Sequence, residues 1–216
     1  MDTGNTYTIT SLAQQERRAW RTSIFIDGNF WRALDTEIVV ELGLHEGQRL
    51  SDEELSKLGR ALETKKALGR AFNLLSHRSR STKELSERLA RAGFEATVVA
   101  EVIEKLQSLN YLDDNDFTDS WLQNRIQTKL YGKHRIKHEL KLKGIADDMI
   151  DEHLAAHSSD DSEYARAFKL AQGKVGSYEG SDAQKSQQRL GRFLMRRGYS
   201  SAIAYRVCKN IFANPD

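Results

Sequence analysis

A repeated pattern constrains the fold of this chain more than any other feature. The segments "STKELSERLARAGF" (81–94), "GKHRIKHELKLKGI" (132–145) and "SQQRLGRFLMRRGY" (186–199) superpose without a gap. In each segment, apolar residues four positions apart lie on one face of a helix, and a glycine follows where a helix end requires positive φ. Self-similarity of this kind indicates tandem repeats of one supersecondary unit.

Each repeat is predicted to contain three helices. Past the glycine the match continues through Val98, Met149 and Ile203, which begin a second amphipathic pattern. A further apolar helix precedes each pair, in "ALGRAFNLLSH", "DFTDSWLQNRI" and "EYARAFKLAQG". We call these helices the first, second and third of each repeat. A unit of about 50 residues is marginal alone, so we expect stacked repeats in an elongated, curved array.

The first 50 residues have a different pattern. "TYTIT" alternates, and Asp27-Gly28 separates two apolar, aromatic runs, as in the tight turn of a hairpin. Ser51 and Glu54 have the spacing of a capping box at a helix start. We therefore predict a mainly α protein with a small β-hairpin-containing N-terminal element. The expected divisions are residues 1–50 for this element and 51–112, 113–157 and 158–216 for the three repeats.

The composition is that of a folded, mostly helical protein. Charged residues make up 30% and hydrophobic residues 39% of the 216 residues, with a single proline. No apolar run approaches the roughly 20 residues of a membrane span, and the start lacks a secretory signal pattern, so we expect a cytoplasmic protein. The only cysteine, Cys208, lies among apolar residues at helical spacing and is predicted to be a buried core residue.

The third repeat contains a Gly- and Ser-rich segment, "GKVGSYEGSDAQKS" (173–186). We predict that it forms a mobile loop between the first and second helices. The spacing of a phosphate-binding loop is absent from it.

Positive charge is concentrated on the second helices, although the formal net charge is only +2. Residues 132–144 hold five Lys or Arg against Glu139, and residues 186–198 hold four Arg and no acid. The third helices at 95–109 and 145–157 are acidic. Aligned second helices would form one basic stripe that attracts a polyanion or an acidic protein surface. The alternative is that these cations pair with acidic neighbours.

The candidate binding residues are the cations of these helices and two arginines before the second helix of the first repeat. They are Lys133, Arg135, Lys137, Lys141, Lys143, Arg189, Arg192, Arg196, Arg197, Arg78 and Arg80. For Arg78 and Arg80 a structural role and a binding role are equally open. In helix-turn-helix proteins the last helix of the pair reads DNA, but here that helix is acidic in two repeats, so we expect backbone contact rather than sequence-specific readout.

The sequence predicts neither catalysis nor a metal or cofactor. No nucleophile-elbow, phosphate-loop or dinucleotide motif is present, which argues against an enzyme. Two histidine pairs have helical metal-ligand spacing without a third ligand nearby, and a magnesium site in "DDND" is a weak alternative to helix capping. These residues are His134 with His138, His153 with His157, and Asp113, Asp114 and Asp116.

Aromatic and apolar residues between the first two repeats have a simpler interpretation. Tyr111, Leu112, Phe117 and Trp121 are predicted to pack at the joint between the repeats, with Asp113 or Asp114 capping the next helix. Arg125, one turn after Trp121, is placed to stack on its ring.

Taken together, these segments resemble the RecX family of recombination regulators over nearly the whole chain. The resemblance is carried by "LLSHRSRSTKELSERLARAGF" (74–94), "LNYLDDNDFTDSWLQNR" (109–125), "GKHRIKHELKLKGI" and the N-terminal "FIDGNFWRALD". Asn110, where the family more often has Gly, and the aromatic-rich hairpin depart from the pattern.

The resemblance implies three tandem three-helix repeats, a cytoplasmic monomer and no cofactor. It also implies a partner, the RecA–DNA filament, bound along its helical groove with recombinase, ATPase and coprotease activities restrained and the SOS response affected. Two other classes stay open: a direct, non-sequence-specific nucleic-acid-binding repeat protein, and a helical scaffold for an acidic protein.

Overall fold

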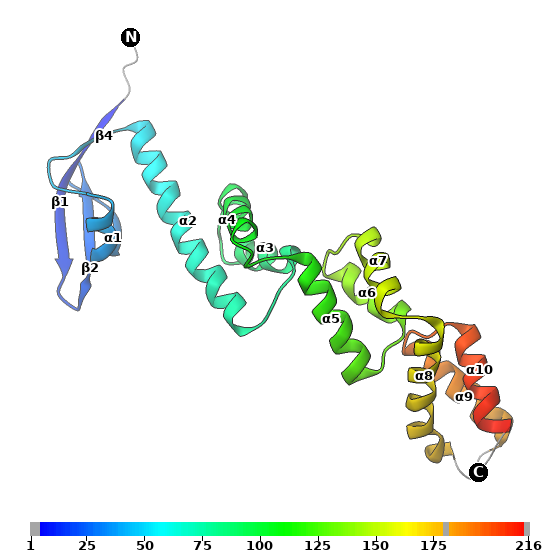
Figure 1. Cartoon of the computed structure of the whole chain (residues 1–216). Coiled ribbons are helices and arrows are strands. Elements are labelled where there is room, and N and C mark those ends of the chain that lie inside the picture. Colours follow the sequence, from blue (N-terminus) through cyan, green and yellow to red (C-terminus); the bar gives the residue numbers. More distant parts are fainter. Residues whose placement is uncertain (1–4, 179–181, 214–216) are drawn as a thin grey trace. The chain divides into compact units, whose positions relative to one another are not determined.

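The computed structural model of the chain describes residues 5–178 and 182–213 (Figure 1). The chain divides into two compact units, residues 1–68 and 69–216. The division falls within a single long helix, α2 (Asp52–His77). No helix in the described ranges is long and apolar enough to cross a membrane.

The N-terminal unit contains a four-stranded antiparallel sheet with the order β3-β2-β1-β4. Its elements are β1 (Thr6–Gln15), β2 (Arg18–Ile26), β3 (Asn29–Asp35), α1 (Thr36–Glu41) and β4 (Arg49–Ser51). The predicted turn is confirmed: Asp27 and Gly28 join β2 to β3 with φ of 48° and 81°, the positive values that a two-residue hairpin turn requires. The core of the unit holds apolar side chains from both the sheet and α1, among them Ile9, Ile24 and Val39.

The helix α2 begins at the predicted capping box. The Ser51 N–H donates to Glu54 Oε2 at 2.8 Å, and the Glu54 N–H donates to Ser51 Oγ at 3.3 Å. Two backbone donors at the helix start are thereby satisfied. The helix then runs 26 residues without a break, so its second half is the first helix of the first repeat.

The C-terminal unit confirms three repeats of three helices. The second helices are α3 (Thr82–Arg91), α6 (Lys133–Leu142) and α9 (Ala183–Arg196); the third are α4 (Ala96–Ser108), α7 (Asp147–His157) and α10 (Ser201–Ala213); α5 (Asp114–Lys129) and α8 (Asp160–Val175) are the first helices of repeats two and three. The aligned apolar residues of the second helices are all buried, and Gly93, Gly144 and Gly198 all have positive φ, at 91°, 84° and 94°. The repeat pattern therefore encodes both the cores and the helix ends.

The predicted packing residues Phe117 and Trp121 belong to the core of the second repeat rather than to the joint between the repeats. Leu112, Phe117 and Cys208 are buried, and Phe117 stacks on Trp121 at 5.6 Å between ring centroids. Asp113 caps α5, accepting from the Asn115 N–H at 2.7 Å. Tyr111 differs: its side chain is exposed, and its ring forms a T-shaped contact with Phe72 at 5.2 Å between centroids.

The predicted loop at 173–186 is wrong in its first part. Helix α8 continues to Val175 and a 3-10 turn follows at Gly176–Tyr178. One glycine in a helix interior costs only about 1 kcal/mol relative to Ala, which is too little to end the helix at Gly173. Residues 179–181 lie outside the described residues. The loop is also shorter at its end, because α9 starts at Ala183, with Asp182 Oδ1 accepting from the Gln184 N–H at 2.8 Å.

Candidate binding surface on the second helices

The three second helices meet head to tail within the C-terminal unit. Ser81 Oγ, at the start of α3, donates to the carbonyl oxygen of Lys143, at the end of α6, at 2.7 Å. The Gly132 N–H, at the start of α6, donates to the carbonyl oxygen of Arg197, at the end of α9, at 2.9 Å. Each contact joins the positive end of one helix dipole to the negative end of the next. We call α3, α6 and α9 together the second-helix row.

Both joints of the row use a carboxylate from the following repeat. The Thr82 N–H donates to Asp114 Oδ1 at 2.8 Å, and the Lys133 N–H donates to Glu163 Oε1 at 2.9 Å. Thr82 and Lys133 are the first residues of α3 and α6, whose N–H groups lack partners within the helix. Glu163 is fully buried. Sequence reasoning missed it, because a glutamate in the first turn of a helix is common and its partner lies 30 residues earlier in the chain.

The joint between α6 and α9 requires glycine on both sides. A Cβ at Gly132 would lie 2.4 Å from the backbone of Gly198, and a Cβ at Gly198 would lie 2.4 Å from the nitrogen of Arg135. Neither distance is compatible with a side chain. Tyr199 adds a hydrogen bond from its hydroxyl to the Leu130 carbonyl at 2.8 Å, and burial raises the pKa of Tyr199 to about 12.

The Lys and Arg residues of α6, and Lys143 just after it, all form ion pairs. The second interpretation of the sequence, in which these cations pair with acidic neighbours, therefore applies to α6. The pairs are Lys133 with Asp160 (3.4 Å) and Glu163 (3.5 Å), Arg135 with Glu139 (3.4 Å), Lys137 with Asp151 (2.5 Å), Lys141 with Asp147 (2.8 Å), and Lys143 with Glu84. Two of these acids lie on α7, the acidic third helix of the same repeat. The formal charge of α6 is therefore largely neutralised where it stands.

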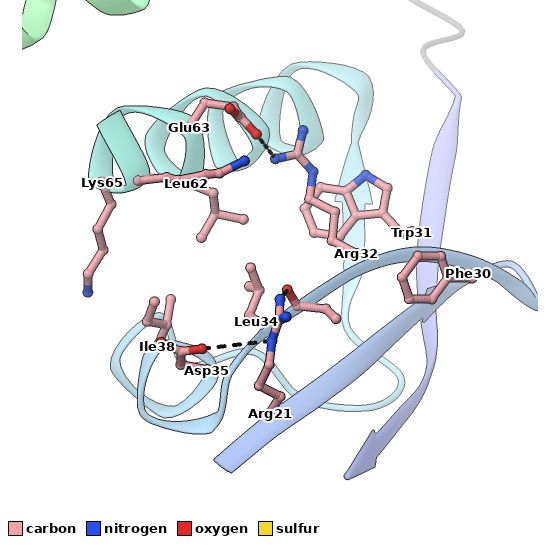
Figure 2. A pocket seen from close by; sticks show the side chains of 12 residues that line it. Arg21, Phe30, Trp31, Arg32, Leu34, Asp35, Ile38, Leu62, Glu63 and Lys65 are labelled. Carbon is pink, nitrogen blue, oxygen red and sulfur yellow. Dashed lines mark hydrogen bonds and ion pairs between the residues drawn. The ribbon is translucent and has the colours of Figure 1, made fainter. Parts of the chain in front are cut away.

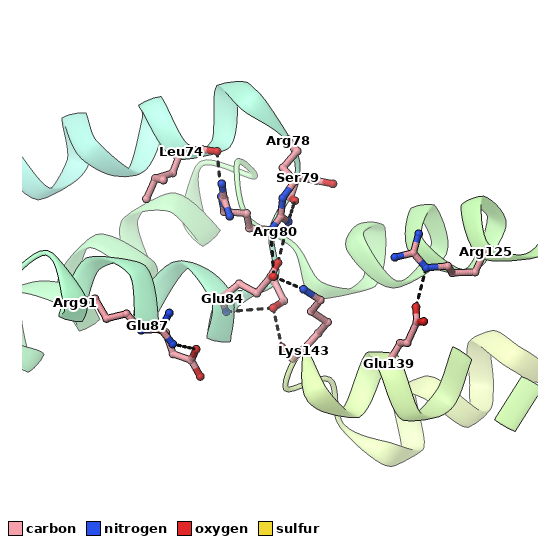
Figure 3. Close-up of polar contacts among 11 residues, drawn as sticks. Leu74, Arg78, Ser79, Arg80, Glu84, Glu87, Arg91, Arg125, Glu139 and Lys143 are labelled. Atoms are coloured by element: carbon pink, nitrogen blue, oxygen red, sulfur yellow. Dashed lines mark hydrogen bonds and ion pairs between the residues drawn. The ribbon is translucent and has the colours of Figure 1, made fainter. Parts of the chain in front are cut away.

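The joint between α3 and α6 has an ionic centre at Glu84 (Figure 3). Glu84 accepts from Arg78 through both oxygens, at 2.9 and 3.1 Å, and it also pairs with Lys143. Burial raises the pKa of Glu84, but the hydrogen bonds from Arg78 and Lys143 outweigh it and bring the pKa to about 2. Arg78 thus has a structural partner, and Arg80 Nε donates to the Leu74 carbonyl at 3.1 Å.

Ser81 and Glu84 also have the spacing of a capping box, but only half of this box is formed. The Glu84 N–H donates to Ser81 Oγ at 3.2 Å, as expected. The Glu84 carboxylate instead faces the two cations, because a hydrogen bond between opposite charges is stronger than one from a neutral N–H.

Helix α9 differs from α6 in its partners. Arg189, Arg192 and Arg196 are exposed, and no carboxylate of the described residues lies within ion-pair distance of them. Arg197 is half-buried, with its guanidinium over the Phe193 ring at 5.2 Å from the centroid. The unpaired positive charge of α6 and α9 is therefore gathered on α9.

Arg125 and the pair His153 and His157 have structural partners. Arg125 stacks on Trp121 at 3.9 Å, as predicted, and its Nε donates to Glu139 at 2.7 Å. Asp119 on α5 contacts His153 and His157 on α7 at 2.5 and 3.1 Å, and the contact with His153 lowers the pKa of Asp119. Within the described ranges no cluster of three or more His, Cys, Asp or Glu could hold a metal ion.

Known family models and relatives match this chain over most of its length. Models of the RecX N-terminal domain and of the first, second and third three-helix domains of RecX match residues 7–51, 67–106, 113–154 and 161–208. The regulatory protein RecX of Listeria welshimeri is 32% identical over 197 residues, which are 91% of this chain and 72% of that protein. That of Clostridium perfringens is 30% identical over 205 residues, which are 94% and 93% of the two chains.

Solved structures show the same fold. A crystal structure of regulatory protein RecX aligns with a TM-score of 0.72 at 24% identity, covering 94% of this chain and 99% of that one. The structure of RecX from Lactobacillus salivarius aligns with a TM-score of 0.65 over 71% of this chain and 99% of that one. The repeats, the family models and the relatives agree, and the chain belongs to the RecX family of regulatory proteins.

Proposed function

We propose that this protein regulates recombination by binding a RecA–DNA filament along its helical groove. Bound there, it restrains the recombinase, ATPase and coprotease activities and thereby affects the SOS response. Membership of a family of regulatory proteins supports the regulatory role.

One observation carries the proposal: the second-helix row ends in α9, whose exposed arginines have no acidic partner in the described part of the chain. A filament repeats both DNA phosphates and protein surfaces along its length. A row of equivalent helices can make several weak contacts to such a target, and each contact raises the effective concentration for the next.

The cations of the row have different roles in this proposal. Arg189, Arg192 and Arg196 are free to meet the filament first. Those of α6 must exchange an existing ion pair for a new one, so each adds less net affinity. Arg78, which is tied to Glu84, supports the joint between α3 and α6.

The test is a binding measurement with purified RecA, with and without single-stranded DNA and nucleotide. We expect binding to the assembled filament to be tighter than binding to the same DNA alone at physiological salt. Equal affinities would instead favour a direct nucleic-acid-binding protein.

That second candidate is supported by a specific feature of the third repeat. Between Ala183 and Ala213 the chain carries no Asp or Glu, and its cations are Lys185, Arg189, Arg192, Arg196, Arg197, Arg206 and Lys209. Affinity based on phosphate contacts alone falls steeply with salt. A shallow salt dependence of filament binding would therefore argue against this candidate.

A further inference from the structure

The third repeat has an open groove between its second and third helices. The groove measures about 550 Å³ and is lined from α9 by Gly191, Arg192 and Met195 and from α10 by Ala204, Tyr205 and Cys208. Met195 is 47% exposed and Tyr205 is 65% exposed, although both are large apolar side chains. We call this feature the α9–α10 groove.

The corresponding face of the second repeat holds a smaller pocket, of about 330 Å³, which is lined by charged residues that include Lys137 and Asp151 and is crossed by ion pairs. Lys137 reaches from α6 to Asp151 on α7 at 2.5 Å, and Lys141 reaches to Asp147 at 2.8 Å. These two bridges hold the helices' outer edges together with side chains that lie across the space between them.

The repeat alignment shows what replaces the bridges in the third repeat. Gly191 and Tyr205 are equivalent to the bridged pair Lys137 and Asp151. Met195 and Ser201 are equivalent to the second bridged pair, Lys141 and Asp147. In the first repeat the same positions hold the small residues Ser86, Ala100, Ala90 and Ala96. The combination of a glycine with two large apolar side chains at these positions therefore occurs in the third repeat alone.

Gly191 has no packing reason to be a glycine. A Cβ built there would lie 3.8 Å from Cys208 Sγ, an ordinary van der Waals distance. A glycine inside a helix weakens it relative to alanine. Its effect here is to leave the floor of the α9–α10 groove uncovered.

The edges of the groove are positively charged. Arg192 lines it, and Arg189 and Arg196, three and four residues away, continue the same helix face. Lys209 lies one turn after Tyr205 on α10 and is exposed. No Asp or Glu occurs between Ala183 and Ala213 to offset these charges.

We propose that the α9–α10 groove is a docking site for a protein segment that presents one large apolar side chain flanked by Asp or Glu. The apolar side chain would lie over Gly191 between Met195 and Tyr205, and the flanking carboxylates would meet the arginines of α9. A nucleic-acid strand fits less well, because single strands stack on successive aromatic rings and Tyr205 is the only aromatic residue among those that line this groove. The inference deepens the proposed function and rests on it for the identity of the partner.

The test transplants a bridge from the second repeat into the full-length chain. Gly191→Lys combined with Tyr205→Asp reproduces the Lys137–Asp151 pair and leaves the net charge unchanged. The probes are a labelled synthetic peptide with one Phe among Asp and Glu residues, the same peptide with Ser in place of Phe, and a single-stranded oligonucleotide. We expect the native chain to bind the Phe peptide roughly tenfold more tightly than the Ser peptide. The double variant should lose this difference and keep its affinity for the oligonucleotide.

A second variant, Met195→Gln, removes one apolar wall at an exposed position and should reduce the preference for Phe severalfold without a risk to the core. Equal binding of the two peptides by the native chain would overturn the inference. So would an oligonucleotide affinity that falls in parallel with the peptide affinity, because the occupant would then be nucleic acid. If the peptide preference holds and the native chain fails to bind a RecA filament, the inference stands and the proposed function fails.

Discussion

Glu84 accepts hydrogen bonds from two cations that come from different repeats. Because its pKa in the folded chain is about 2, below the ordinary 4.5, its ionised form stabilises the fold. This stabilisation is fully present above pH 4.5 and is lost as the pH falls from there towards 2. Glu84→Gln should therefore lower the free energy of unfolding by about 1–2 kcal/mol at pH 7, after allowance for solvent screening. Urea denaturation of the native chain and of the variant, at pH 7 and at pH 2, measures this difference in the free energy of unfolding.

Glu87, one turn later on α3, provides the matched control. It pairs with Arg91 at 3.1 Å, but both side chains are largely exposed. Glu87→Gln should change the free energy of unfolding by no more than about 0.5 kcal/mol at either pH. Equal effects of the two substitutions at pH 7 would contradict a structural role for Glu84.

Gly132 is required by the close approach of two backbones. Gly132→Ala would place a Cβ 2.4 Å from Gly198, so we expect a loss of about 1–3 kcal/mol in the free energy of unfolding. Gly69→Ala is the control, because no atom lies within 4 Å of its Cβ; this change in α2 should stabilise the chain by about 0.5–1 kcal/mol. Thermal unfolding of both variants compares them, and a neutral Gly132→Ala would remove the steric argument.

Single residues could be predicted from sequence where their partners are local. The Ser51–Glu54 capping box, the Asp27-Gly28 turn and the stacking of Arg125 on Trp121 all join residues within one or two turns. The contacts of Glu84 with Lys143 and of Glu163 with Lys133 could not be found in this way. Lys143 lies 59 residues from Glu84, and only the stacking of repeats brings the two together.

At the scale of elements, α6 and α9 have similar sequences and different electrostatics. Residues 132–144 and 186–198, which cover most of α6 and α9, carry the same formal charge, but α7 supplies Asp147 and Asp151 to α6, while α10 supplies no acid to α9. Counting charges along one helix cannot reveal this difference, because it depends on the helix packed alongside. The positive charge of the basic stripe predicted from sequence is therefore largely neutralised at its middle helix, α6.

Removing the acids of α7 should expose the charge of α6. The hydrogen bond from Lys141 lowers the pKa of Asp147, so the Asp147 carboxyl is ionised at neutral pH. Asp147→Asn with Asp151→Asn frees Lys137 and Lys141. We expect the affinity for single-stranded DNA to rise severalfold and its salt dependence to steepen, as measured by fluorescence anisotropy across a salt series.

Glu104→Gln with Glu152→Gln makes the same change in net charge at exposed positions outside these ion pairs. If net charge alone governed the affinity, this control and the Asp147/Asp151 double variant would bind DNA equally well. Tighter DNA binding by the Asp147/Asp151 variant than by the control is the result that supports exposure of Lys137 and Lys141.

At the scale of the whole molecule, the repeated sequence pattern was sufficient to predict a mainly α architecture of three three-helix repeats. It did not predict that α2 is continuous from Asp52 to His77, because the residues before Ala67 lie outside the repeat alignment. It also could not predict the joints of the second-helix row, which connect residues more than 60 positions apart. These joints nevertheless recur at equivalent positions, because each connects the start of one second helix to the end of the second helix in the next repeat.

The central claim is that the second-helix row engages a RecA filament through the free arginines of α9. Inhibition of RecA strand exchange by Arg189→Gln, Arg192→Gln and Arg196→Gln combined tests it most directly, with Lys105→Gln, Lys129→Gln and Lys169→Gln as a charge-matched control on other helices. The α9 variant should require roughly tenfold more protein for half-inhibition, while the control stays close to the native chain. Inhibition by a folded α9 variant at the native concentration would contradict the claim.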